Sequence, residues 1–395
     1  MAQTEDKRGT AENKHIEYLE VLRVLSMLSV VFLHAAAGSL RGNYGSAVWH
    51  VSNVVTAVMS TSVPIFFMIS GSVLMNSSNT LSLETTFKKR LPRSLVPFLV
   101  WSFVAVGYYA ALSFVTSGNI DVVSAVKRIK NMVSQPTTIH LWFMYVLIPL
   151  YILSPLLKKL VDSLTNQLVI YMMALWLFFS SLLPTAAALA PARFRPLLTL
   201  NASYNLNFMS GYIGYFLAGY FLMRLEKRFS VKLLSGIIIL DTVLISLGTW
   251  YKTAQLGEYS EVFKSYSKIF TLVLSVSIFL LMKELLRGRS LTGRLKGVIG
   301  TMSALSFGVY LLHNLLVDLI SRLVKLWPAA SLTVLFLSYA VVLVLTTLCI
   351  VVLASIKPIC FAFTGLTFKN ACEACNLQFF FRKIFKPAAP LNLNR

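Results

Sequence analysis

Apolar residues run in long uninterrupted stretches along this chain, with short polar segments between them. A helix that rises about 1.5 Å per residue needs about 20 apolar residues to cross the hydrocarbon of a membrane. Stretches of this length recur about ten times, so the sequence predicts an all-α integral membrane protein with about ten transmembrane helices in one bundle. We expect them near residues 18–38, 48–75, 93–115, 139–158, 168–190, 208–224, 232–251, 267–283, 298–323 and 330–356.

Composition supports this interpretation. Of the 395 residues, 56% are apolar and only 13% are charged, which excludes an ordinary soluble domain. The formal net charge of +21 could suggest nucleic acid as a partner. However, the basic residues form short clusters between the apolar stretches, which is the pattern of cytosolic loops in membrane proteins. We therefore expect membrane lipid, and no nucleic acid, around the chain.

The distribution of basic residues also predicts the orientation. Lys and Arg are more than twice as frequent in the alternate loops that include both chain ends as in the other loops. Since cytosolic loops carry the excess of basic residues, both termini are expected in the cytosol. The predicted organisation is a cytosolic N-terminal segment (1–17), a transmembrane domain (18–356) and a cytosolic tail (357–395). The tail contains the segment LQFFFRKIF, which predicts a helix lying on the inner leaflet.

The first apolar stretch, LEVLRVLSMLSVVFLHAAAG, contains Arg23 and His34. A charged side chain inside a membrane costs roughly 2.5–3.5 kcal/mol on insertion scales, so it is usually retained for a function or a partner. Eleven residues make about three helical turns plus 20°, so both side chains share one face, roughly 16 Å apart. In the functional interpretation His34 is a general acid or base and Arg23 binds an anion. In the alternative, Arg23 pairs with Glu20 and His34 faces the lipid headgroups.

A basic cluster precedes the third stretch, in FKKRLPRSLVPF. It contains Lys88, Lys89, Arg90 and Arg93. Guanidinium groups match phosphate oxygens, so this cluster could hold the phosphates of a cytosolic nucleotide-like donor such as coenzyme A. The alternative, which physical reasoning alone favours, is an ordinary basic loop that sets membrane topology.

Small and aromatic residues give further candidates. Ser70 and Gly71 favour close helix approach, and no Gly-x-Ser-x-Gly turn marks Ser70 as a nucleophile. His140, Trp142 and Tyr145 are expected at the outer membrane face, either as part of an aromatic belt or as a surface on which a sugar ring stacks.

The ninth stretch carries Tyr310 and His313, which are neighbours at i, i+3. A histidine inside a membrane is a functional candidate, although a hydrogen-bonded structural histidine fits equally well. Asp318 and Arg322 are expected to pair with each other. Among the four cysteines, Cys372 and Cys375 form a C-x-x-C with no second pair or nearby His, so no metal site is expected, and the role of these two residues is left open.

Taken in order, these motifs resemble the acyltransferase-3 family of membrane O-acyltransferases, and in particular its stand-alone surface-polysaccharide O-acetyltransferases. The resemblance covers about residues 16–356. The matching features are Arg23-x10-His34 after Glu20, PIFFMISG at Pro64–Gly71, Arg90-x-x-Arg93, HLWFMY at His140–Tyr145, GYIGYFLAGY at Gly211–Tyr220 and LSFGVYLLH at Leu305–His313.

The resemblance implies an enzyme of the bacterial cytoplasmic membrane. It implies that an acyl group, usually from acetyl-CoA as co-substrate, moves to a hydroxyl of a cell-surface or lipid-linked glycan. It also implies that His34 is catalytic, that Arg23 is its partner, and that Arg90 and Arg93 bind the donor. No bound cofactor is implied. The sequence alone leaves open an exporter of glycan precursors or a non-catalytic membrane partner, although it shows no internal repeat of the kind found in many transporters.

Overall fold

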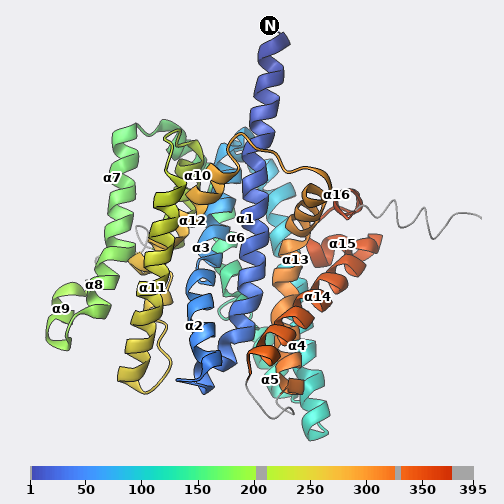
Figure 1. Ribbon diagram of the computed structural model, residues 1–395. Coiled ribbons are helices and arrows are strands. Elements are labelled where there is room, and N and C mark those ends of the chain that lie inside the picture. The colour runs from blue at the N-terminus through green and yellow to red at the C-terminus, as the bar shows by residue number, and fades with distance from the viewer. Residues whose placement is uncertain (1, 202–210, 325–330, 376–395) are drawn as a thin grey trace, which may run out of the picture.

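Helices make up the regular structure throughout the described part of the chain, which comprises residues 2–201, 211–324 and 331–375 of a computed structural model. Within these residues, nine helical segments are long and apolar enough to cross a membrane, which confirms the predicted all-α membrane architecture (Figure 1). These segments are Glu17–Gly42, Ala47–Asn76, Thr85–Ser117, Ile139–Ser163, Asn166–Leu189, Val231–Leu256, Val262–Leu285, Gly293–Leu323 and Leu332–Ser355.

One predicted span is represented by a shorter helix. The stretch at 208–224 contains α10 (Tyr212–Arg224), whose 13 residues extend about 20 Å, less than the roughly 30 Å of a bilayer core. Residues 202–210 lie outside the described residues. The described helix α10 is therefore too short to span the membrane by itself.

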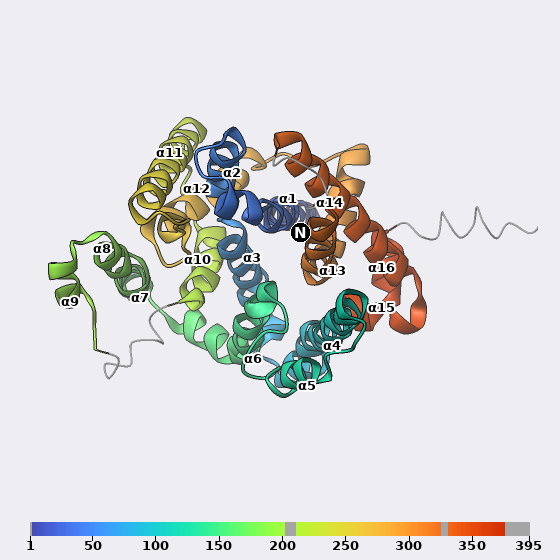
Figure 2. The same cartoon turned by 90° about the horizontal axis from the view of Figure 1, so that it is seen from below.

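The first helix lies in the interior of the bundle, with α2, α3, α13 and α14 around it (Figure 2). Its side chains Tyr18, Leu22, Met27 and Val31 are almost completely buried.

The α-helices are α1 (Ala2–Gly42), α2 (Ala47–Met59), α3 (Ser62–Asn76), α4 (Leu91–Ser117), α5 (Val122–Lys130), α6 (Trp142–Ser163), α7 (Asn166–Leu177), α8 (Leu183–Leu189), α9 (Arg195–Leu198), α10 (Tyr212–Arg224), α11 (Val231–Leu256), α12 (Ile269–Leu285), α13 (Gly293–Val324), α14 (Leu332–Ser355), α15 (Lys357–Thr364) and α16 (Phe368–Ala374). Short 3₁₀ or π segments are η1 (Ser78–Leu81), η2 (Thr85–Arg90), η3 (Ile139–Leu141), η4 (Phe178–Leu182), η5 (Ala192–Phe194) and η8 (Val262–Lys264).

The second predicted span is divided into α2 and α3 at Ser60 and Thr61. Pro64 has no backbone N–H with which to continue the helical ladder. The hydroxyls of Ser60 and Thr61 donate to the carbonyls of Ala57 and Val58, both at 2.8 Å, and such local bonds compete with regular helix.

Helices α3 and α10 approach each other unusually closely. A Cβ atom placed on Gly71 would lie 1.7 Å from the carbonyl oxygen of Phe216, and one on Gly219 would lie 1.9 Å from that of Met68. Only glycine permits this separation of the two backbones, as in other membrane helix pairs. The close approach predicted for the Ser70–Gly71 segment is therefore present in the structure.

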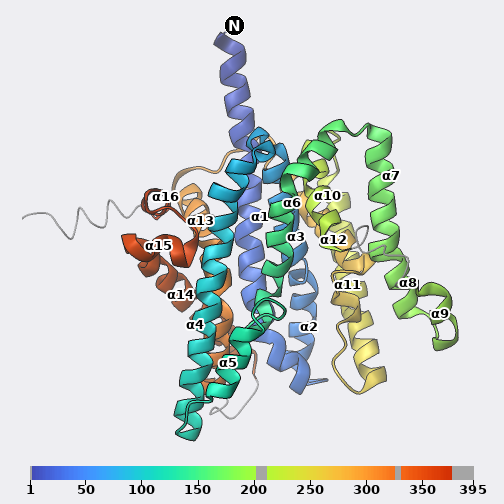
Figure 3. The same cartoon turned by 180° about the vertical axis from the view of Figure 1, so that it is seen from behind.

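The described part of the predicted tail packs against the bundle. Helix α15 lies beside α4 (Figure 3), and the Trp101 indole donates to the carbonyl of Phe363 at 2.9 Å. The Thr301 hydroxyl donates to the carbonyl of Ala374 at 2.5 Å, which ties α16 to α13. The remainder of the predicted interfacial segment, from residue 376, lies outside the described residues.

Candidate active site

Three histidines from distant parts of the sequence meet inside the bundle. His34 comes from α1, His140 from η3 at the start of α6, and His313 from α13. The ring centroids are 5.1 Å apart for His34 and His313, 4.9 Å for His140 and His313, and 6.2 Å for His34 and His140. Each residue was a candidate from the sequence, but no sequence pattern indicated that the three form one cluster.

Both ring nitrogens of His140 are occupied. Its Nε2 lies 3.1 Å from the carbonyl oxygen of Leu311, which can only accept, so Nε2 carries the proton. Its Nδ1 then accepts from the Thr138 hydroxyl at 3.0 Å. The side chain is 3% exposed. These two hydrogen bonds fix the orientation of the His140 ring beside the other two histidines.

His313 uses only one of its nitrogens. Its Nδ1 donates to the carbonyl of Tyr310 at 2.6 Å, and the side chain is completely buried. Its Nε2 is also buried and has no hydrogen-bond partner among the described residues. With the proton held on Nδ1, Nε2 carries a lone pair and can only accept a hydrogen bond.

His34 is the accessible member of the three. It is half-buried, and within the described residues it forms no hydrogen bond. Its contacts with the other two rings direct it toward the bundle interior and not toward lipid headgroups. A hydroxyl that approaches His34 would therefore displace no hydrogen bond to another described residue.

Arg23, about three turns from His34 on α1, also faces inward. Its Nη1 donates to the Ser303 hydroxyl on α13 at 3.2 Å. In the described part of the chain Arg23 forms no direct ion pair with Glu20, although the Glu20 carboxylate is near enough to interact electrostatically with the guanidinium. The carboxylate that fastens the start of the span is that of Glu17, which pairs with Lys296 at 2.8 Å. The Arg23 guanidinium therefore keeps its charge available to a ligand.

A cavity of about 400 Å³ adjoins Arg23, within the size range of small-molecule sites. Three guanidinium groups line it, and no aspartate or glutamate occurs among its described lining residues. The remaining lining is apolar or hydroxyl-bearing, and includes the predicted residue Ser70. The lining residues are Arg23, Phe66, Ile69, Ser70, Val73, Leu74, Arg90, Arg93, Ser94, Phe143, Leu147, Tyr151, Ser303, Ala304, Ser306, Phe307, Tyr310, Thr364, Gly365 and Leu366.

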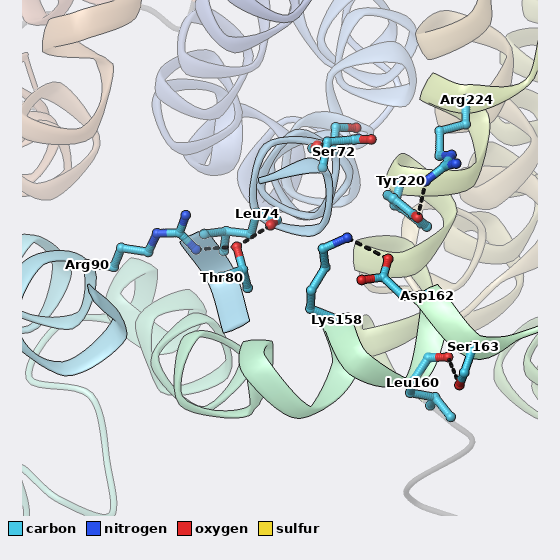
Figure 4. Close-up of polar contacts among 11 residues, drawn as sticks. Ser72, Leu74, Thr80, Arg90, Lys158, Leu160, Asp162, Ser163, Tyr220 and Arg224 are labelled. Atoms are coloured by element: carbon cyan, nitrogen blue, oxygen red, sulfur yellow. Dashed lines mark hydrogen bonds and ion pairs between the residues drawn. The ribbon is translucent and has the colours of Figure 1, made fainter. Parts of the chain in front are cut away.

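The four basic residues before α4 take different positions. Arg90 is held at the cavity wall because its guanidinium donates to the hydroxyl of Thr80 (Figure 4) and to that of Ser77, the latter at 2.9 Å. Arg93 also lines the cavity. Lys88 and Lys89 are exposed and do not line it, and Lys88 pairs with Glu84 at 3.2 Å. The structure therefore brings the two arginines, but not the two lysines, to the cavity.

Two other cations in this region are engaged elsewhere. Lys158 pairs with Asp162 at 2.5 Å, and the Arg224 guanidinium donates to the Tyr220 hydroxyl at 2.5 Å (Figure 4). Neither lines the cavity. The anion-binding potential of this part of the bundle is thus concentrated on the three arginines of the cavity.

Tyr310 connects the cavity to the histidines. It lines the cavity, its ring lies 5.5 Å from that of His140 and 5.9 Å from that of His313, and its hydroxyl donates to the His140 carbonyl. The neighbouring pair predicted from the sequence, Asp318 and Arg322, forms an ion pair at 2.8 Å further along α13. A ligand whose charged end meets the arginines would thus extend toward the histidine cluster.

The two other predicted aromatic residues lie outside the cavity. The Trp142 ring lies 5.2 Å from that of Tyr212 and 5.8 Å from that of Tyr266, so it belongs to an aromatic cluster within the protein. Tyr145 packs edge-on against Phe98, and its hydroxyl donates to backbone carbonyls of the α5–η3 loop, among them that of Gln135 at 2.9 Å. Tyr145 thus fastens a loop.

One wall of the cavity comes from a segment that the sequence assigned to the tail. Thr364, Gly365 and Leu366, after α15, line the cavity. Gly365 has φ +71°, and a Cβ there would lie 2.2 Å from the carbonyl oxygen of Arg93. A glycine that ends a helix in this conformation is common, so the sequence offered no sign of this role.

No group of three or more His, Cys, Asp or Glu side chains in the described part of the chain could hold a metal ion. Among the described residues, only two of the three clustered rings, those of His34 and His313, have a free nitrogen, since His140 uses both of its own.

Comparison with known proteins gives one match. A family model described as an acyltransferase domain matches residues 16–355, which is most of the chain and includes every helix that contributes a histidine or an arginine to the site. No curated protein and no solved structure matches the chain.

Proposed function

The chain belongs to this family of acyltransferases, and from that membership we propose that it is a bacterial cytoplasmic-membrane O-acetyltransferase. It moves an acetyl or similar acyl group from cytosolic acyl-CoA to a hydroxyl of a cell-surface or lipid-linked glycan. The observation that carries the proposal is the cavity with three arginines and no described acidic residue, which leads toward three clustered histidines. In the proposed membrane topology both chain ends lie in the cytosol, as the excess of basic residues in their loops predicts.

The cavity suits an anionic and partly apolar donor. Arg90 and Arg93 hold phosphate groups near the start of α4, because guanidinium groups bind phosphate through paired charge-assisted hydrogen bonds. Apolar side chains such as Phe143 and Leu147 accommodate the uncharged arm of the donor. Since Arg23 lies roughly 16 Å from His34 along α1, it contacts the donor away from the reacting carbonyl.

The reaction requires a base beside the acceptor hydroxyl. His34 takes the hydroxyl proton as the acceptor oxygen attacks the thioester carbonyl. The carbon–sulfur bond then breaks, the ester is released, and the proton on His34 passes to the sulfur of the departing coenzyme A. No proton is gained or lost in total. The apolar surroundings exclude water, which would otherwise hydrolyse the thioester.

The proposal is tested with inside-out membrane vesicles and acetyl-CoA labelled in the acetyl group. Vesicles from cells that contain the protein should transfer label to glycan, and vesicles from a deletion strain should not. Mass spectrometry of surface glycan from the two strains then identifies the modified sugar. Equal acetylation in both strains would refute the proposal. Loss of the glycan itself from the surface, without loss of label transfer, would instead indicate an exporter.

The segment after α15 should control donor affinity. Gly365→Ala would place a methyl group against the Arg93 carbonyl, so the segment must move away from α4. We expect the affinity for coenzyme A, titrated against purified protein, to fall about 10-fold, equivalent to about 1.4 kcal/mol.

A matched control separates this contact from backbone strain. Gly257 has the same φ of +71°, but a Cβ there would meet no atom within 4 Å. Gly257→Ala should therefore carry the strain of the left-handed conformation without loss of affinity. If both variants weaken coenzyme A binding equally, the segment after α15 is not part of the donor site.

A further inference from the structure

The Nε2 atom of His313 is buried and has no hydrogen-bond partner among the described residues. A buried polar atom without a hydrogen bond is unfavourable, and native structures retain few of them, often for a functional reason. His313 Nε2 is such an atom, in a side chain with no exposed surface. Because the backbone carbonyl of Tyr310 holds the ring proton on Nδ1, Nε2 can only accept a hydrogen bond.

Among the described residues whose rings contact His313, only His34 can supply the donor. Both nitrogens of His140 are occupied, and the Tyr310 hydroxyl already donates to the His140 carbonyl. His34 has no hydrogen-bond partner among the described residues, and its ring centroid lies 5.1 Å from that of His313. An N–H···N bond of about 2.9 Å between two imidazoles, with nitrogens ~1.1 Å from each ring centre, places the centroids about 5 Å apart. The rings are therefore already at the separation that such a bond requires, although they are not bonded in the structure.

We propose that His313 is a positioning residue that accepts a hydrogen bond from His34 during acyl transfer. The inference rests on the proposed function. The bond fixes His34 in one tautomer, with the proton on the nitrogen that faces His313 and the lone pair on the nitrogen that faces the acceptor hydroxyl. His313 thus has the orienting role that a carboxylate has in a Ser-His-Asp triad.

Proton movement in this scheme is confined to His34. The free nitrogen of His34 takes the proton from the acceptor hydroxyl and later returns it to the sulfur of coenzyme A. His313 stays neutral throughout, with its proton on Nδ1, and its lone pair stabilises the transient His34 cation. A neutral imidazole suits this location because a carboxylate inside the bundle would carry a far larger desolvation cost.

Two substitutions at His313 separate orientation from packing. His313→Leu removes the acceptor while a buried side chain of similar bulk remains, and His313→Gln keeps an acceptor oxygen near the position of Nε2. In vesicles supplied with labelled acetyl-CoA, we expect His313→Leu to lower the maximal transfer rate about 100-fold, as partners that orient catalytic groups do. The acetyl-CoA concentration for half-maximal rate should be unchanged. His313→Gln should recover at least about a tenth of the normal rate.

The tautomers can be measured directly in the unmodified protein. The sequence contains five histidines, so ¹⁵N-histidine labelling gives a readily assigned spectrum. We expect an unprotonated Nε2 in His313 and an unprotonated Nδ1 in His140. The spectrum does not depend on activity, so it remains informative if the leucine variant fails to fold.

The outcomes distinguish this inference from the proposed function. Transfer by the His313→Leu protein at the normal rate, or a protonated Nε2 on His313, would overturn the role of His313 alone. Absence of transfer by the unmodified protein would overturn the proposed function, while the tautomer measurement would still report on the cluster. A raised half-maximal concentration with an unchanged maximal rate would show that His313 affects donor binding, which contradicts the inference.

Discussion

Replacement of His34 by alanine is expected to lower acyl transfer about 10²–10⁴-fold, the usual contribution of a general base. His34 is the half-buried member of the histidine cluster and has no competing hydrogen bond within the described residues. Transfer is measured as labelled acetyl incorporated into glycan by membrane vesicles. Because the arginines and the cavity are untouched, coenzyme A affinity of the purified variant should stay at the normal value.

His50→Ala is the appropriate control for the loss of a histidine. His50 is exposed on α2 and does not belong to the cluster. It should leave transfer unchanged. If His34→Ala acetylates glycan normally, or if the two alanine variants lose activity equally, His34 is not the base and the proposed mechanism fails.

The second large effect is expected from Arg90→Ala combined with Arg93→Ala. Each guanidinium can make charge-assisted hydrogen bonds to phosphate, worth about 1.5–3 kcal/mol apiece. Removal of both should weaken coenzyme A binding by about 10²-fold or more. The measurement is a calorimetric titration of coenzyme A into the purified variant. Arg90 also bonds Ser77, so the melting temperature of the variant is compared with that of the normal protein.

Lys88→Ala combined with Lys89→Ala provides the matched control. These residues belong to the same basic segment and carry the same total charge, but they are exposed and do not line the cavity. The lysine variant should bind coenzyme A with nearly normal affinity. Equal loss in both double variants would show that the segment attracts the donor through its charge alone, without a specific site at the cavity wall.

The cavity also explains why the basic segment could not be interpreted from the sequence. Four basic residues at the start of a membrane helix are ordinary, and their spacing does not reveal which of them face inward. That choice depends on the π-helical turn at η2 and on the hydroxyls of Ser77 and Thr80, which hold Arg90 at the wall. Neither feature has a periodic signal in the sequence.

The aromatic residues after His140 show a similar limit. Trp and Tyr near the end of a membrane helix usually belong to an interfacial belt. Here Trp142 contacts Tyr212 at the start of α10 and Tyr266 in the connection between η8 and α12. Contacts of this kind depend on which helices become neighbours, and hydropathy alone does not specify neighbours.

The sequence by itself determined the class of the protein, its long apolar helices and the inward face shared by Arg23 and His34. These properties follow from hydropathy and helical periodicity, which act within a single segment. Only the tertiary structure decided that His34 meets His313 and His140, that two of four basic residues reach the cavity, and that the segment after α15 lines it. The physical reason is that these contacts join segments far apart in the chain. Their geometry is set by packing, for example where Gly71 lets α10 approach α3, and no local pattern encodes it.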